Sequence, residues 1–221
     1  MDALIAEFPR FAAGFLGTLR ICLFAGVAAL VFGTVLAGFR VSPVPPLRWI
    51  GTAWVTVFRN SPLTVVLFTS AFALPQIGVI FPTFAGNAFF WPGVAGLACY
   101  TAAFVCEAVR AGINSVPPGQ AEAARAIGLT FQQSLGTVVL PQALRTVVPP
   151  LGSVIIAMIK NSAIVGAFGV AGELFSVEAR LTAEGYSALS SLTGVALAYL
   201  LITIPAGLLL GVLERKIEVK R

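Results

Sequence analysis

A cation, an amide and a hydroxyl stand side by side inside an apolar stretch. Lys160, Asn161 and Ser162 interrupt the hydrophobic run from Val138 to Phe175. A buried ammonium in hydrocarbon costs at least ~2.5 kcal/mol unless it is paired or faces water. A crossing that starts near Val147 therefore predicts a polar solute pathway at these residues. If the crossing starts near Thr137 instead, Lys160 reaches the outer membrane interface and needs no such role.

A second polar pair lies near the carboxyl end of another apolar stretch. Glu107 and Arg110 are three residues apart, so they share one face of a helix. This spacing predicts a structural ion pair that holds the helix end. Direct contact of the two side chains with a solute is the alternative.

Several other chemistries find no support in the sequence. Histidine is absent, which removes the commonest metal ligand and general base. Cys22, Cys99 and Cys106 lack CxxC spacing and are predicted to be buried apolar residues. No G-x-x-x-x-G-K-[ST] phosphate loop is present, so the chain does not bind ATP in that manner. We expect no enzyme activity and no cofactor in this chain.

The composition requires these residues to be positioned by membrane helices. Of the 221 residues, 58% are hydrophobic and 10% are charged, whereas soluble domains carry about 25% charged residues. A membrane-crossing helix needs about 20 apolar residues. We predict an all-α polytopic membrane protein with a single domain over residues 1–221 and about five transmembrane helices. The predicted spans are Ile21–Phe39, Ile50–Leu74, Pro92–Ile113, one crossing that starts near Val147, and Leu192–Leu213.

The positive residues predict the orientation of these spans, because Lys and Arg mark the cytoplasmic side. Ten of the 14 fall on or toward one side: Arg40, Arg48, Arg59, Arg110, Arg125, Arg145, Arg215, Lys216, Lys220 and Arg221. We therefore expect a multi-pass protein of the inner (plasma) membrane with its carboxyl terminus in the cytoplasm and its amino terminus outside.

The segment 115–141 is predicted to be a cytoplasmic loop between the third and fourth spans. Pro117 and Pro118 end one helix and can open another, and Gln120–Ile127 is rich in good helix formers. Gly128 then interrupts. A short helix with these boundaries favours docking of another protein. A plain surface helix that links two spans is the alternative.

This loop resembles the signature loop of bacterial ABC importer permeases. The shared pattern is Glu-Ala-Ala, a glycine after three residues and a later Leu-Pro pair, and Val138 stands where that family favours isoleucine. In that family the loop forms a coupling helix seated in a groove of the ATP-hydrolysing subunit. The resemblance implies that coupling to an ATPase belongs to Glu122, Ala123, Ala124, Gly128, Leu140 and Pro141.

Other segments are similar to the polar amino-acid branch of the same family. Phe58–Leu63 is similar to its Arg-Gly-Thr-Pro-Leu pattern, and the segment that begins at Lys160 resembles its Lys-Asp-Thr-Ser-Leu pattern. Asparagine replaces the acid of that second pattern, so Lys160 has no neighbouring counter-charge, which favours an acidic solute such as glutamate. The candidate substrate pathway is Lys160, Asn161, Ser162, Arg59 and Ser61.

The resemblance implies the membrane-spanning subunit of an ATP-driven importer for a polar amino acid. It implies a second permease subunit, either another copy or a sister chain, and two ABC ATPase subunits that hold ATP and Mg. It also implies an extracytoplasmic amino-acid-binding protein that delivers the solute. The remaining partner is the lipid bilayer, and no nucleic acid is expected.

Two rival functions stay open at this stage. An ion-gradient-driven secondary carrier or channel usually shows internal repeats and intramembrane carboxylates. Five spans do not divide into equal halves, and the carboxylates inside the predicted spans, Glu107 and Glu173, both lie near span ends. A non-transporting membrane anchor of a complex would need no polar residue at the depth of Lys160.

Overall fold

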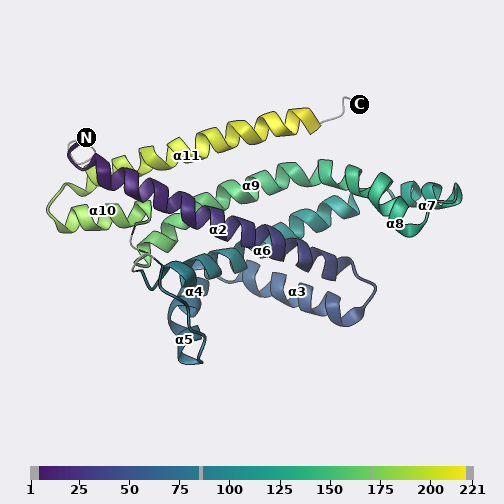
Figure 1. The fold of residues 1–221 in the computed structure, drawn as a ribbon, viewed down its shortest axis with the longest axis horizontal. Coiled ribbons are helices and arrows are strands. Elements are labelled where there is room, and N and C mark those ends of the chain that lie inside the picture. The colour runs from purple at the N-terminus through teal and green to yellow at the C-terminus, as the bar shows by residue number, and fades with distance from the viewer. Residues whose placement is uncertain (1–4, 85–86, 171, 218–221) are drawn as a thin grey trace.

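The chain is a bundle of long helices with a short helical hairpin at one end (Figure 1). The computed structural model describes residues 5–84, 87–170 and 172–217. Its helices are α2 Phe8–Val41, α3 Pro45–Asn60, α4 Leu63–Phe68, α5 Leu74–Gln76, α6 Phe90–Asn114, α7 Pro118–Ala126, α8 Phe131–Ser134, α9 Leu140–Ala167, α10 Leu174–Ala183 and α11 Ala188–Ile217. Two π-helical turns, Thr69–Ala73 and Leu135–Val139, join α4 to α5 and α8 to α9.

The number of crossings agrees with the predicted all-α polytopic fold. Four helices are long and apolar enough to cross a membrane: α2, α6, α11 and α9 with the π-helical turn before it. A fifth crossing is formed if α3 and the segment Leu63–Gln76 count as one span bent by 110°. The described part of the chain thus has four straight candidate spans and one broken one.

The second span is not the continuous helix that we predicted from Ile50 to Leu74. Its first half ends at Asn60, and Ser61 is extended with φ −95° and ψ 139°. Pro62 causes this break, because proline has no N–H and disfavours the helical conformation in the residue before it. The hydroxyl of Ser61 donates to the carbonyl of Val57 at 2.8 Å. Figure 1 shows α4 and α5 projecting away from the other helices.

Other span boundaries also differ from the prediction. The first span begins at Phe8 rather than Ile21. The fourth span begins at Gly136, with α9 itself starting at Leu140, so it matches the alternative start near Thr137 and not Val147. Lys160 therefore lies toward the far end of this span, nearer the membrane interface than a start at Val147 predicted. The span ends at Ala167 rather than Phe175, so α10 is a separate helix. The prolines inside α9 do not prevent the helix from beginning before them. Long membrane helices tolerate proline where neighbouring groups form hydrogen bonds with the backbone groups that proline leaves unpaired.

The core is built around α6, which packs against α2, α3, α4 and α9. Its contact with α2 is very close, since a Cβ added at Gly33 would lie 2.7 Å from the carbonyl oxygen of Ala102. Ala25, Ala29 and Ala103 are also buried. Small residues allow membrane helices to approach at backbone distance, and this contact fixes the position of α6.

A buried carboxylate joins α2, α10 and α11. Glu173 is 0% exposed and accepts hydrogen bonds from the Thr18 hydroxyl at 2.8 Å, from the Phe175 N–H at 2.6 Å and from the Tyr199 hydroxyl. Its placement inside the fourth span was wrong, because it follows α9 as the N-cap of α10. A Cβ at Gly17 would lie 1.7 Å from the carbonyl oxygen of Gly172, so α2 touches this turn directly.

The two ends of the bundle differ in charge. The amino terminus and α10 lie at one end, and the α2–α3 turn, α7, α8 and the end of α11 lie at the other (Figure 1). Helix ends or segments at the second end carry Arg40, Arg48, Arg110, Arg125, Arg145, Arg215 and Lys216. Lys220 and Arg221 lie outside the described residues.

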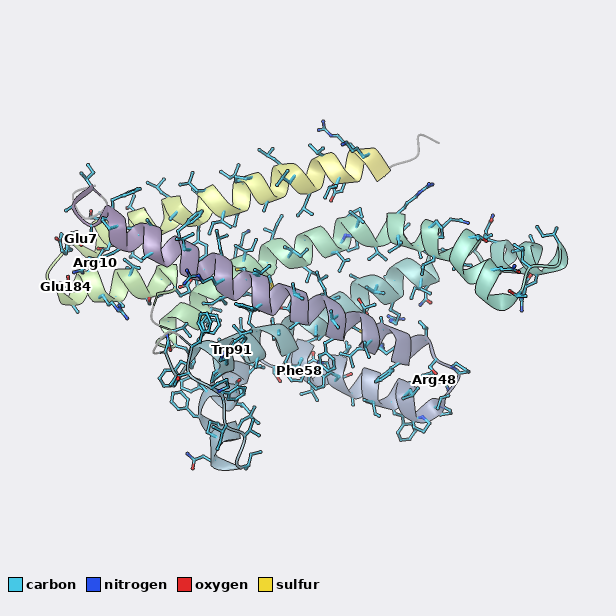
Figure 2. The ribbon with its side chains drawn as sticks, in the orientation of Figure 1. Glu7, Arg10, Arg48, Phe58, Trp91 and Glu184 are labelled. Atoms are coloured by element: carbon cyan, nitrogen blue, oxygen red, sulfur yellow. The ribbon has the colours of Figure 1, made fainter. Side chains whose placement is uncertain are left out.

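The first end instead gathers acidic groups around one arginine. Figure 2 shows Glu7, Arg10 and Glu184 together near the amino terminus. Arg10 Nε lies 3.1 Å from Glu7, and the Tyr186 hydroxyl donates to Glu7 at 2.9 Å. That hydrogen bond to a carboxylate raises the pKa of the Tyr186 phenol.

Candidate functional site

The helix predicted at Gln120–Ile127 is present as α7, Pro118–Ala126. It ends in a Schellman motif: the Leu129 N–H donates to the Ala124 carbonyl at 3.1 Å and the Gly128 N–H to the Arg125 carbonyl at 3.0 Å. Gly128 has φ +91°, a conformation that side chains with a Cβ rarely adopt. The glycine therefore sets the end of α7 and the direction of the chain beyond it.

The surface of α7 suits contact with another protein. Glu122, Ala123 and Gly128 are exposed, and Ile127 is 79% exposed. Ala124 instead is buried at 5% exposure and holds α7 against its own chain. The structure thus places a small-residue surface with one acidic and one apolar group at the end of the bundle.

The chain then returns to the bundle through a capped turn. The Thr130 N–H donates to the Gln133 side chain at 2.9 Å and the Gln133 N–H to the Thr130 hydroxyl at 3.3 Å, which is a capping box. Leu140, 44% exposed, and the exposed Pro141 lie in the first turn of α9. They follow a π-helical turn rather than sitting on α7 itself.

The segment that carries α7 is fastened to both α6 and α9. The hydroxyls of Ser115 and Thr146 are 2.8 Å apart, and Ser115 donates to the Gly112 carbonyl at 2.7 Å. A Cβ at Gly112 would lie 2.0 Å from the Val147 side chain, so the two helices are in tight contact there. The chain that leads into α7 is therefore in contact with both α6 and α9.

The same two helices border a groove of about 330 Å³, here called the α6–α9 groove. Its lining residues are Tyr100, Thr101, Phe104, Ser153, Val154, Ala157, Met158 and Asn161. Aromatic surface with a few hydrogen-bonding groups is typical of small-molecule sites. None of these residues is charged, so the groove itself offers hydrogen bonds and apolar contact.

Thr101 is the most informative residue of the groove. Its side chain is only 4% exposed, and its hydroxyl has no hydrogen-bond partner among the residues that the structure describes. A buried polar group left unpaired costs about 1–3 kcal/mol. This hydroxyl is enclosed in the wall of the groove, so a bound molecule would reach it only if the lining side chains moved.

The structure separates the members of the predicted substrate pathway. Asn161 lines the groove, and Lys160 lies three residues after Ala157 on the adjacent face of α9, exposed and without an ion pair to any described residue. Ser162 is fully buried and bonds to the Ile159 carbonyl at 2.8 Å. Ser61 lies at the bend, beside a different and apolar cavity of about 350 Å³.

Glu107 is the centre of a larger cluster than the sequence indicated. Arg110 lies 3.1 Å and Arg59 3.6 Å from its carboxylate, and Arg40 also contacts it. The sequence revealed Arg110 through helix spacing, but Arg40 belongs to α2 and has no local signal. Arg59 lies with its guanidinium carbon 5.8 Å from the ring centre of Phe104, and Phe104 is a lining residue of the α6–α9 groove.

The described residues show no grouping that would hold a metal. Among them, no three or more His, Cys, Asp or Glu side chains gather at one place. Cys106 is buried, and Cys22 and Cys99 are partly buried in the apolar core.

The comparisons of this chain with known proteins agree on one protein family. The family described as binding-protein-dependent transport system inner membrane component matches residues 29–219. The chain is 38% identical to a probable glutamine ABC transporter permease of Bacillus subtilis, over 99% of this chain and 98% of that protein. It is 35% identical to a glutamate transport system permease of Corynebacterium glutamicum, over the full length of both.

A third relative is the glutamate/aspartate import permease of Escherichia coli K12, 36% identical over 93% of this chain and 86% of that protein. Among solved structures, a chain from the crystal structure of an amino acid ABC transporter with histidines superposes with a TM-score of 0.87 at 31% identity, covering 97% of each chain. A chain of an inward-facing methionine ABC transporter shares the fold at a TM-score of 0.71 and 23% identity, with 96% of each chain covered.

Proposed function

The chain belongs to the family of binding-protein-dependent transport system inner membrane components, and we propose which of its parts bind the solute and which contact the ATPase of an amino-acid importer. The α6–α9 groove receives the solute. The helix α7 is the contact with a separate ATP-hydrolysing subunit. This assignment makes the chain a permease without enzyme activity, and ATP and Mg belong to the partner.

One observation carries this proposal: α7 is joined to the same two helices that border the groove. Coupling needs a rigid contact with two discrete arrangements. The hydroxyl contact between Ser115 and Thr146 and the packing of Gly112 on Val147 supply that rigidity. Approach of two ATPase subunits on binding ATP would move α7 and, with it, α6 and α9. The groove would then open outward, and hydrolysis would return it to the inward state.

The distribution of charge supports an orientation with α7 in the cytoplasm. The basic end of the bundle holds α7 and the carboxyl-terminal end of α11, and excess Lys and Arg mark the cytoplasmic side. In this orientation the opposite end, with Glu7 and Glu184, would face an extracytoplasmic binding protein, and the words binding-protein-dependent in the family's description support such a partner. A second permease subunit, identical or related, completes the pathway.

The solute that fits this arrangement is an acidic amino acid, and we assign glutamate. Lys160 is exposed, forms no ion pair with a described residue and is the sequence neighbour of Asn161, which lines the uncharged groove. The named relatives carry glutamine, glutamate, or glutamate and aspartate, which agrees with a polar solute of this size.

Reconstitution tests the assignment directly. The chain is co-expressed with its candidate ATPase and binding protein, purified as a complex and placed in proteoliposomes with ATP inside. We expect glutamate with binding protein to stimulate ATP hydrolysis and to drive labelled glutamate into the vesicles. Uptake that follows an ion gradient and ignores ATP would make the chain a secondary carrier. A complex that neither transports nor hydrolyses in response to any amino acid would leave only an anchoring role.

A further inference from the structure

The Glu107 cluster has more positive charge than it can neutralise. Three guanidinium groups surround one carboxylate, and no other described acid forms an ion pair with them. Arg40 and Arg110 have side chains that are 17% and 33% exposed, whereas Arg59 is 47% exposed. The positive charge of one of the three arginines is therefore poorly neutralised.

Arg59 is the least firmly held member. Its nearest nitrogen is 3.6 Å from Glu107 Oε2, while Arg110 lies 3.1 Å from the same oxygen. Hydrogen bonds between N–H groups and oxygen are usually 2.7–3.2 Å long, so the Arg59 contact is a loose ion pair. Exposed ion pairs of this kind contribute little to stability, and another anion can displace them.

The position of Arg59 connects it to the solute. It stands at the end of α3, just before the break at Ser61, and its guanidinium lies over the ring of Phe104. Phe104 lines the α6–α9 groove, and its ring centre is 5.1 Å from that of Tyr100, a second lining residue. The Phe104 ring is therefore shared by the groove and by the Arg59 guanidinium, so a change of the Arg59 rotamer could bring the guanidinium to a molecule in the groove.

We propose that Arg59 determines substrate specificity by exchanging its loose contact with Glu107 for the side-chain carboxylate of the amino acid in the groove. The inference rests on the proposed function and deepens it. Arg40 and Arg110 keep Glu107 neutralised when Arg59 leaves. The guanidinium can bind a carboxylate through two parallel N–H groups, which a lysine ammonium at this position could not do.

The charges on both sides of the groove define the solute class. Lys160 precedes the lining residue Asn161 on α9, Arg59 lies beside the lining residue Phe104, and the lining itself is uncharged. An amino acid with two carboxylates can use both cations. Its amide can use only one, and a cationic side chain would be repelled. The class selected is an acidic amino acid.

Solute binding is measured on the permease–ATPase complex in nanodiscs, without binding protein or ATP. This separates binding in the groove from delivery of the solute by the binding protein. Labelled glutamate is bound and competed with unlabelled glutamine for wild type, Arg59→Gln and Arg59→Lys. Arg48→Gln is the matched control, because Arg48 lies about three turns earlier on the same helix, near the α2–α3 turn, and has no ion pair with a described residue (Figure 2).

We expect Arg59→Gln to weaken glutamate binding about tenfold and glutamine binding less than twofold, with Arg59→Lys in between and Arg48→Gln unchanged. Equal loss for both ligands, or no loss, would overturn the proposal. If Arg59→Gln does not assemble, Arg59→Lys decides, and an unchanged glutamate-to-glutamine ratio refutes the role. If the wild-type complex transports another amino acid and binds no glutamate, the specificity role falls while the importer assignment stands.

Discussion

Replacing Gly17 by alanine tests the close contact between α2 and the turn that precedes α10. The new Cβ would lie 1.7 Å from the backbone oxygen of Gly172, whereas real Cβ contacts essentially never fall below 3.0 Å. A backbone carbonyl cannot rotate away as a side chain can. Gly17→Ala must therefore move α2 away from the turn.

The cost of that movement follows from the contacts beside it. Thr18 donates to Glu173 at 2.8 Å and accepts from the Leu174 N–H at 3.1 Å, and both bonds cross the gap that has to widen. Hydrogen bonds inside membrane proteins average about 0.6 kcal/mol, and overpacking costs about 1–3 kcal/mol. Alanine regains up to about 1 kcal/mol of helix propensity. The net destabilisation is about 1–3 kcal/mol.

Gly38→Ala is the matched control, since Gly38 lies on the same helix and a Cβ there has no neighbour within 4 Å. Thermal unfolding of the detergent-purified chain, followed by size-exclusion fluorescence, gives the comparison. At about 2–4 °C per kcal/mol for a chain of this length, we expect Gly17→Ala to lower the apparent Tm by about 2–12 °C. Gly38→Ala should leave it equal or higher. Equal Tm values for the two variants would refute the close contact.

Three further outcomes are expected. Glu173→Ala should lower the Tm more than Glu173→Gln, because alanine leaves Thr18, Tyr199 and the Phe175 N–H without an acceptor; the reverse order in the same thermal assay would contradict the network. Gly128→Asp should abolish ATP-driven uptake with normal membrane insertion, since it blocks α7 docking and places a Cβ at φ +91°; normal uptake in proteoliposomes would exclude that role for α7. Lys160→Ala should reduce glutamate uptake about tenfold, the loss expected for one charged contact, with Lys216→Ala on α11 as control; unchanged uptake would remove Lys160 from the pathway.

The sequence was sufficient for the class of fold, because hydropathy over 20 residues is a strong physical signal. The helix α7 was also predictable, since Pro118 and Gly128 are local determinants of its ends. The bend at Ser61 was missed although Pro62 is visible in the sequence. The run after it is as apolar as a continuous span, so hydropathy alone does not distinguish the two.

The contacts around the candidate site were less predictable for a different reason. Glu107 and Arg110 are local partners, but Arg40 and Arg59 reach the same carboxylate from other helices. Thr18 and Tyr199 likewise meet Glu173 from distant segments. One sequence gives no information on which helix faces meet, and these partners became visible only with the tertiary packing.

The broken second span has a consequence for how the protein is made. The helix α3 has 16 residues and is about 24 Å long, less than the ~30 Å of hydrocarbon in a bilayer. The segment after the bend is shorter still and leans on α6, where the Ser70 hydroxyl donates to the Pro92 carbonyl at 2.6 Å. Neither half can be released into lipid alone with its ends satisfied. The two halves must therefore enter the bilayer together, and the contact with α6 completes the satisfaction of this region's polar groups.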